Sequence, residues 1–319
     1  MPPRAANREP PSPPIGAIVG STATGKTELA LAVAETVAVE ILVADSRQVY
    51  RGMDIGTAKP DAAARMAVPH HLLDLAAPDE PFSVADWLIA ARDAVSQVAG
   101  RGRLPLLVGG SGLYVAALLD GYDLGATPSP AAIRADLDTA LVHHGLPALA
   151  ARLVALDPVT AAATDLRNPR RVVRALERAQ WSGGAAPRPQ SLPWPGEMVQ
   201  IGLHRPRVVL DDRIAKRAAA LFAGGLLSEV RQLLDAGYGP DLPPMTGHGY
   251  AEAARFLVGE WSLDEAIAVT VRRTRQYARR QETWFRRDRR IQWFDAGSAS
   301  AADPDLVRRA AAALGVAAG

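Results

Sequence analysis

The sequence contains no cysteine, which excludes disulfide bonds and thiolate metal sites. Aromatic residues make up only 5% of the 319 residues, so the core must consist mainly of alanine, valine and leucine side chains. The net charge is only +2, because 36 lysines and arginines face 34 acidic residues. No stretch approaches the roughly 18 consecutive apolar residues of a membrane span. These absences predict a soluble, cytoplasmic protein with no membrane partner.

The N-terminus lacks the apolar run of a secretory signal. Residues 1–14 contain six prolines instead, a composition typical of disordered chain. We therefore predict a disordered tail at 1–14, followed by folded protein from Ile15. The remaining length suffices for one large domain or two smaller ones.

The most informative stretch is GSTATGKT at 20–27, which fits the pattern G-x-x-x-x-G-K-[ST]. It lies between the apolar run 15–19 and a helical pattern, the context that a phosphate-binding loop requires. The glycines let backbone amides approach an anion, and the positive end of the helix faces the same point. The lysine adds a full charge, and the last threonine offers a hydroxyl to Mg²⁺, the expected cofactor. The residues predicted to bind phosphate are Gly20, Ser21, Thr22, Ala23, Thr24, Gly25, Lys26 and Thr27.

Two further predicted strands end in polar residues. Asp45 follows the apolar run 39–44, where open α/β sheets place their ligands. Its carboxylate suits a metal ligand or a general base, and a helix cap is the structural alternative. Ser111 lies in a glycine turn at 109–114, after the apolar run 104–108. Because parallel strands bring their carboxyl ends to one edge, this serine either faces the phosphate loop or caps a helix.

The segment 48–60 is polar and contains glycine, so we expect it to form a wall of the substrate site. His70 and His71 form a vicinal pair in a short predicted strand. Since adjacent side chains leave a strand on opposite faces, a structural role is favoured over metal binding for this pair.

The chain contains a series of distinctive motifs: GSTATGKT at 20–27, ADSRQVYRGMDIGTAKP at 44–60, GGSGLY at 109–114, RALE at 174–177, GY at 249–250 and QYARRQETWFR at 276–286. Together they resemble the bacterial tRNA dimethylallyltransferase family, also called tRNA isopentenyltransferases, and they match in the family's order from Ile15 to about Phe294. The motif at 44–60 is far more specific than the phosphate loop, which many NTPases share.

The resemblance implies a prenyltransferase that moves a dimethylallyl group from dimethylallyl diphosphate to the exocyclic amine of adenine 37 in tRNA, a base that is first flipped out. The phosphate loop would then hold the diphosphate of the donor, with Thr27 at Mg²⁺. Asp45 would be the general base. Ser111, where the family usually has threonine, would hydrogen-bond polar groups of the site. Lys26 and Arg213 would face the leaving diphosphate, and a monomer is the family expectation.

The resemblance and the arginine distribution together predict the tRNA contacts. The span 272–290 contains nine arginines, two acidic residues and interleaved aromatics, the composition of an RNA-binding surface. Thr246 stands where the family often has arginine, which weakens the case for a charged contact there. The residues expected to touch the anticodon stem-loop are Asp45, Ser46, Arg47, Gln48, Ser111, Arg134, Arg170, Arg171, Arg174, Gly249, Tyr250, Arg279, Arg280, Gln281, Trp284 and Arg286.

The predicted fold is α/β, with a P-loop NTPase-like parallel sheet flanked by helices and a small all-helical insertion domain. The core domain is expected to comprise 15–125 and 199–319. The alanine-rich stretch 126–198, which carries recurrent arginines, predicts the insertion. In the family this insertion closes over the tRNA. Without that resemblance, the arginines would be interpreted as charged side chains on a solvent-exposed helix face.

In the second half of the chain, the spacing of apolar residues predicts two helices. One covers 211–236 with a break at Gly224 and Gly225, and the other covers 263–281. The inward-facing residues of the second helix are expected to be Ile267, Val271, Thr274 and Ala278.

Without the resemblance, the residues are also compatible with three other functions. A P-loop kinase of a small molecule would share the loop, Mg²⁺ and Asp45. An isopentenyltransferase acting on free adenine nucleotides would share the donor chemistry, and an RNA-binding NTPase switch is the non-enzymatic alternative. The arginine-rich segments favour a polynucleotide acceptor.

Overall fold

The computed structural model describes residues 12–122, 131–183 and 191–315. Most of the predicted tail and part of the proline-rich linker before Met198 therefore lie outside the described residues. The chain separates into two compact units. Unit 1 comprises Met1–Gly121 and Leu192–Gly319, and unit 2 comprises Tyr122–Ser191.

Unit 1 is built on a six-stranded sheet in which all neighbouring strands are parallel. The strand order is β3-β2-β4-β1-β5-β6. The three central strands β2, β4 and β1 are buried along their whole length, which explains their continuous apolar runs, because helices cover both faces of a parallel sheet. The strands are β1 (Ile15–Val19), β2 (Val39–Ala44), β3 (His70–His71), β4 (Leu104–Gly109), β5 (Met198–His204) and β6 (Ile291–Asp295).

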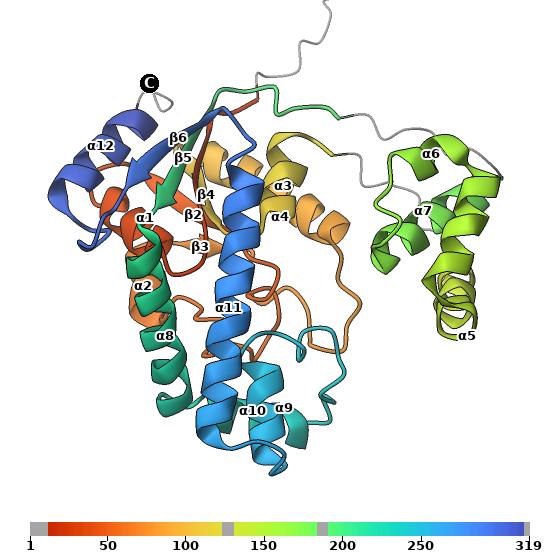
Figure 1. Ribbon diagram of the computed structural model, residues 1–319. Helices are drawn as coiled ribbons and strands as arrows, with labels where there is room; N and C mark the ends of the chain where they lie inside the picture. The colour runs from red at the N-terminus through yellow and green to blue at the C-terminus, as the bar shows by residue number, and fades with distance from the viewer. Residues whose placement is uncertain (1–11, 123–130, 184–190, 316–319) are drawn as a thin grey trace, which may run out of the picture. The chain divides into compact units, whose positions relative to one another are not determined.

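Helices α1 and α12 cover one face of this sheet, and α3 and α4 cover the other (Figure 1). On the first face, Leu29 of α1 and Leu306 of α12 belong to the same buried cluster as Val43 of the sheet. On the second face, the indole nitrogen of Trp87 donates to the carbonyl of Val43 at 3.3 Å. The helices of unit 1 are α1 (Lys26–Ala34), α2 (Ala62–Ala67), α3 (Val84–Gly100), α4 (Gly112–Leu119), α8 (Arg207–Ala223), α9 (Leu226–Asp235), α10 (Tyr250–Leu257), α11 (Leu263–Phe285) and α12 (Pro304–Gly315).

The second half of unit 1 places a long helix, α11, beside α8 and α10 (Figure 1). The expected break between α8 and α9 is confirmed, since Gly225 takes a left-handed conformation with φ 109°. Helix α11 continues four residues beyond the predicted end at 281. The prediction of which residues of this helix face inward was wrong in part, because the helix packs against neighbours on more than one side. The buried residues of α11 are Ala266, Thr270, Ala278, Gln281 and Phe285.

Unit 2 contains three helices in its described part, α5 (Ala131–Leu156), α6 (Pro158–Ala162) and α7 (Pro169–Trp181). Helix α7 begins at a proline after Asn168, whose side chain accepts from the backbone N–H of Arg171. A separate apolar cluster holds the unit together. It contains Leu137, Leu149, Leu153, Ala161, Val172, Val173, Ala175 and Leu176.

Helix α5, over Ala132–Leu156, is long and apolar enough to cross a membrane by length and composition. The sequence analysis had predicted no stretch of this kind. The backbone leaves helical geometry at Gly145, with φ 74° and ψ 170°, and Pro147 follows. This kink divides α5 into two helices, each shorter than the roughly 20 residues of a membrane span.

Candidate active site

A pocket of about 630 Å³ opens at the edge of the sheet where β1, β2 and β4 end. Both glycine loops and the polar segment after β2 contribute to it, which confirms that the strands deliver their following residues to one edge. The lining includes Thr22, Ala23, Gly25, Lys26, Thr27, Glu28, Asp45, Gln48, Thr57, Ala58, Lys59, Pro60, Asp61, His70, Gly109, Gly110, Arg213, Arg217, Tyr277 and Gln281.

The loop between β1 and α1 needs its glycines. Gly20 has φ 143°, and a Cβ there would lie 2.4 Å from the carbonyl oxygen of Leu203. Gly25 has φ 101° and precedes the first turn of α1, whose backbone N–H groups have no partner within the helix. Gly25, Lys26, Thr27 and Glu28 all line the pocket, so these amides lie where a helix N-terminus could receive an anion.

Lys26 is folded back onto the same loop, where its ammonium donates to the carbonyl of Ser21 at 2.7 Å. Burial lowers the pKa of Lys26 to about 8; the carboxylate of Asp45 opposes this shift and the guanidinium of Arg217 adds to it. A diphosphate in the pocket would offer the lysine a stronger partner than a carbonyl, because hydrogen bonds between charged groups are shorter and stronger.

Gln281 of α11 joins the two glycine loops. Its side-chain oxygen accepts from the backbone N–H of Thr22 at 2.8 Å, and its nitrogen donates to the carbonyl of Gly110 at 2.8 Å. The residue is 6% exposed, and a Cβ on Gly110 would lie 2.3 Å from its nitrogen. Gln281 therefore braces the two loops and also lines the pocket; its predicted contact with tRNA stays a prediction. The amide of Thr22 is engaged by the same bond.

Asp45 sits directly after β2 and lines the pocket. Its Oδ1 accepts from the backbone N–H groups of Arg47 at 2.8 Å and Gln48 at 3.4 Å, which fixes the carboxylate in a tight turn. Ser111 occupies the N-cap position of α4 but makes no capping bond; its hydroxyl accepts from the N–H of Ser46 at 3.0 Å instead. The serine thus supports the turn that carries Asp45.

Two arginines of α8 face this pocket. The Nε of Arg213 donates to the carbonyl of Ala23 at 2.9 Å, which holds this cation against the phosphate loop. Arg217, which the sequence analysis missed, lines the pocket one turn further along. Burial lowers its pKa, as does Arg213, whereas Asp45 raises it. The spacing of four residues on one helix was the signal that could have paired it with Arg213.

Two other lining residues, Tyr277 and His70, were also missed as site residues, whereas Lys59 belongs to the segment 48–60 that the sequence predicted as a wall of the site. Burial raises the pKa of the Tyr277 phenol, and Asp45 raises it further. His70 lies beside the pocket with its Nδ1 hydrogen-bonded to the carbonyl of Val68 at 2.7 Å. His71 has the expected structural role, because its Nε2 contacts the buried carboxylate of Glu40 at 2.7 Å.

A buried guanidinium, also missed, holds the phosphate loop from behind. Arg205 is 5% exposed, and its Nε donates to the carbonyl of Thr24 at 2.7 Å. Its Nη1 donates to three carbonyls of the segment after β6, those of Ala296, Gly297 and Ala299. The last strand and the phosphate loop are thereby tied together.

Several arginines along helix α11 fall into two groups. Arg273 and Arg275 point into the protein, toward Glu252 and Asp211 respectively. Arg279, Arg280 and Arg286 are exposed, and within the described residues neither Arg279 nor Arg280 forms an ion pair. Trp284 is 37% exposed on the same segment. Arg286 pairs with Glu282 at 2.6 Å, so Arg279 and Arg280 are the two whose charge stays available to a polyanion.

The arginines of unit 2 also divide. Arg134 and Arg174 both contact the buried carboxylate of Glu177, at 3.7 and 2.8 Å. Arg170 and Arg171 are exposed at the start of α7. The first pair therefore helps to hold unit 2 together, and the second pair is available on its surface.

The remaining residues expected at tRNA have contacts inside unit 1. Tyr250 is 2% exposed, and its hydroxyl donates to Glu229 at 2.5 Å. Gly249 donates its N–H to Glu252 at 2.7 Å. Arg47 donates to the carbonyl of Pro243. In this conformation these groups position the chain around the pocket.

A phosphate-binding loop, a facing carboxylate and two arginines at the carboxyl edge of a parallel sheet define a P-loop α/β enzyme. Comparison with known proteins then identifies the family. The IPP transferase family matches residues 48–288, and the isopentenyl transferase family matches residues 13–68. The chain belongs to the IPP transferase family.

Individual relatives cover nearly the whole chain. It is 48% identical to a tRNA dimethylallyltransferase of Roseiflexus sp. (strain RS-1), over 86% of this chain and 90% of that protein. It is 46% identical to a tRNA dimethylallyltransferase of Thermobifida fusca, over 92% of each.

Solved structures show the same fold. The full-length tRNA isopentenylpyrophosphate transferase of Bacillus halodurans is 38% identical, with a TM-score of 0.71 over 96% of this chain and 97% of that one. A eukaryotic dimethylallyltransferase acting on tRNA has a TM-score of 0.75 over 94% of this chain and 78% of that one. At 23% identity the second likeness shows the fold alone. The predicted fold class and family are both confirmed.

Proposed function

We propose that this protein transfers the dimethylallyl group of dimethylallyl diphosphate to the exocyclic amine of adenine 37 in tRNA, with release of pyrophosphate. The observation that carries this proposal is the convergence of the phosphate loop, Lys26, Arg213 and Asp45 on one pocket. Relatives named tRNA dimethylallyltransferase, among them two that are 48% and 44% identical, support the same reaction over a kinase or an enzyme of free nucleotides.

The reaction exchanges one bond for another. The adenine amine forms a bond to the allylic carbon while the carbon–oxygen bond to the diphosphate breaks, and pyrophosphate leaves with the electron pair. Negative charge grows on the leaving group, so Lys26, Arg213 and Arg217 stabilise it along with the loop amides. Asp45 takes the amine proton. Because its Oδ1 already accepts two backbone bonds, Oδ2 is the oxygen expected to receive that proton.

Mg²⁺ fits this pocket as a partner of the diphosphate. Among the described residues no group of three or more His, Asp or Glu side chains could hold a metal by itself. Mg²⁺ takes oxygen ligands and commonly keeps several waters and substrate phosphates, and the Thr27 hydroxyl and the Asp45 carboxylate both line the pocket. We assign Thr27 as the protein ligand. Bound Mg²⁺ would neutralise charge on the departing diphosphate.

The acceptor is proposed to be the anticodon stem-loop. Exposed Arg279, Arg280 and Arg286 would neutralise its phosphates, and Trp284 would offer a surface for stacking. Exposed Arg170 and Arg171 support a role for unit 2 in closing over the RNA. We further propose that the enzyme acts as a cytoplasmic monomer.

One assay tests the proposal. The protein is incubated with Mg²⁺ and labelled dimethylallyl diphosphate, with unmodified tRNA, AMP or ATP as the acceptor. Label in adenine 37 of tRNA is the expected result. Label in AMP would favour the free-nucleotide enzyme, and phosphate release from ATP without prenyl transfer would favour a kinase or an NTPase switch.

A further inference from the structure

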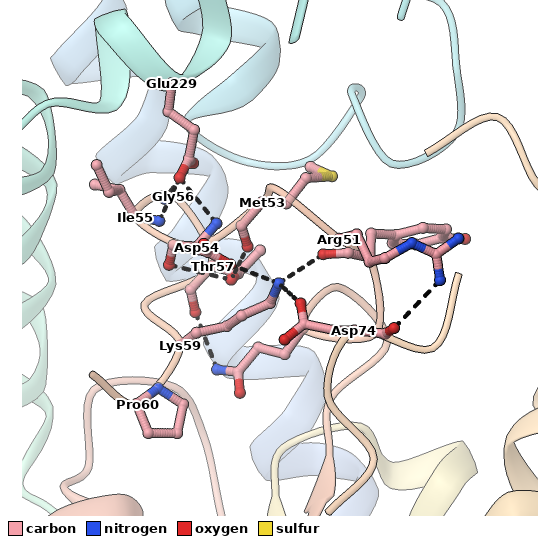
Figure 2. Close-up of polar contacts among 12 residues, drawn as sticks. Arg51, Met53, Asp54, Ile55, Gly56, Thr57, Lys59, Pro60, Asp74 and Glu229 are labelled. Carbon is pink, nitrogen blue, oxygen red and sulfur yellow. Dashed lines mark hydrogen bonds and ion pairs between the residues drawn. The ribbon is translucent and has the colours of Figure 1, made fainter. Parts of the chain in front are cut away.

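The buried carboxylate of Glu229, on α9, has no role in the reaction as proposed. The residue is 8% exposed, and among the described residues no lysine, arginine or histidine forms an ion pair with it. Three consecutive backbone N–H groups donate to it instead, those of Asp54 at 2.8 Å, Ile55 at 2.7 Å and Gly56 at 3.1 Å (Figure 2). The hydroxyl of Tyr250 supplies a fourth bond at 2.5 Å.

This arrangement fixes the backbone of the segment 54–56. Successive amides that turn toward one point form an anion cradle, and here the anion belongs to the protein itself. A buried charge without a cation depends on such hydrogen bonds, so removing one partner leaves the others poorly satisfied. The segment and the carboxylate therefore hold each other in place.

The next residues of the same segment form a wall of the pocket. Thr57, Ala58, Lys59 and Pro60 all line it. Gln48, whose own N–H contacts Asp45, donates through its side chain to the carbonyls of Thr57 at 3.1 Å and Ala58 at 3.3 Å. The wall is thus held by Gln48 on one side and, through the preceding three residues, by Glu229 on the other.

Lys59 completes the support of this wall (Figure 2). Its side chain is 1% exposed, and its ammonium contacts Asp54 at 2.7 Å and Asp74 at 2.5 Å. It also donates to the carbonyl of Tyr50 at 2.6 Å. Protein acceptors thus engage the ammonium group of Lys59 with three contacts, so the lysine links parts of the wall to one another.

Packing around Gly56 locks the two helices to the segment. A Cβ at Gly56 would lie 2.4 Å from the ring of Tyr250 and 2.8 Å from Leu226. Only glycine lets the phenol of α10 and the start of α9 approach this closely. A movement of either helix would therefore move the wall.

We propose that Glu229 is a positioning residue that sets the wall Thr57–Pro60 of the donor pocket through the amides of 54–56. The inference rests on the proposed function. Glu229 is not among the residues that line the pocket, so its influence passes through the backbone that it binds.

The test compares Glu229→Gln with wild type in two measurements. In hydrogen exchange of the segment 54–60, the variant is expected to exchange at least about tenfold faster, because an amide oxygen replaces a carboxylate and its NH₂ group repels the loop N–H groups. In calorimetry without tRNA, the dissociation constant for dimethylallyl diphosphate is expected to rise about tenfold, the equivalent of one or two lost hydrogen bonds.

Glu40→Gln is the matched control. Glu40 is also a buried carboxylate, 3% exposed, but it lies near the start of β2, whereas Asp45 and the pocket lie at the strand's other end. Its loss should leave donor affinity and exchange of 54–60 unchanged. Tyr250→Phe keeps the ring against Gly56 and removes one bond to Glu229. It should show a smaller effect that disappears in the Glu229→Gln background, the behaviour of a coupled pair.

The outcomes separate the two proposals. Unchanged exchange of 54–60 in Glu229→Gln would overturn the positioning role, whatever the enzyme's activity. If wild type fails to bind or transfer the donor while exchange responds as expected, the proposed function falls and the bracing of this segment stands. If exchange of 54–60 rises but donor affinity does not change, Glu229 braces this segment without positioning it for the donor, and the positioning role is overturned.

Discussion

The side chain of Gln281 and the backbone N–H of Thr22 are joined by a 2.8 Å hydrogen bond across 259 residues of sequence. The same side chain reaches the carbonyl of Gly110. A helix rich in exposed arginine is thereby connected to both glycine loops of the pocket. The helix proposed to receive RNA and the loop proposed to hold the diphosphate consequently share one rigid contact.

The first prediction concerns this contact. Gln281→Leu removes both bonds and leaves the N–H of Thr22 and the carbonyl of Gly110 without their partner, so the KM for dimethylallyl diphosphate should rise by about 10- to 100-fold. Steady-state kinetics at saturating tRNA measure the effect. Gln276→Leu, at an exposed position of the same helix, is the control. A KM equal to that of wild type would show that the bridge does not shape the loop.

The second prediction concerns the carboxylate in the pocket. Asp45→Ala should lower the rate of prenyl transfer by about 10²- to 10⁴-fold, because the general base is lost. Binding of tRNA, measured by filter retention, should remain close to wild type. Asp79→Ala removes an exposed aspartate for comparison. Ordinary turnover by the Asp45 variant would remove this residue from the mechanism.

The third prediction concerns the pH dependence set by Lys26. Its pKa lies at about 8, so the lysine of the free enzyme is cationic below that pH and neutral above it. The value of kcat/KM for dimethylallyl diphosphate should therefore fall as the pH rises through about 8. In Lys26→Ala, kcat/KM should be low throughout and this alkaline limb should be absent. A variant that retains both the limb and the wild-type rate would place the diphosphate elsewhere.

The fourth prediction concerns stability at low pH. Hydrogen bonding to Arg101 is the largest cause that lowers the pKa of Glu40 to about 2, and His71 lowers it further. A depressed folded-state pKa stabilises the protein above the unfolded value of 4.5, and this contribution is lost as the pH falls toward 2. Chemical unfolding at several pH values should show this loss in wild type. In Glu40→Gln it should be smaller by on the order of 2 kcal/mol.

The fifth prediction concerns the exposed arginines of α11. Replacing Arg279, Arg280 and Arg286 with glutamine should reduce the slope of log affinity for tRNA against log salt by about one unit for each lost phosphate contact. Binding is measured between low and physiological salt. The control replaces three exposed arginines on other helices, Arg92, Arg231 and Arg308. An equal loss of slope in both triple variants would show that only total charge matters.

The sequence determined the parts of this protein that depend on local pattern. Apolar runs gave the central strands, because strands covered on both faces must be apolar throughout. The glycines and the lysine of 20–27 identified the phosphate loop, since its geometry is local and depends on residues that permit positive φ. Asp45 could be placed in the pocket because a parallel sheet delivers the residues after its strands to one edge.

The tertiary structure decided everything that depends on contacts between distant segments. Arg217 and Tyr277 enter the pocket from helices whose orientation no local pattern specifies. Gln281 and Tyr250 were expected at the RNA; the structure adds that both are buried and hydrogen-bonded within unit 1, and that Gln281 also lines the pocket. Glu229 lies 173 residues or more from the amides it binds. Residue type and spacing encode local conformation, whereas the partner of a buried polar group is set by packing, which assembles only in the folded chain.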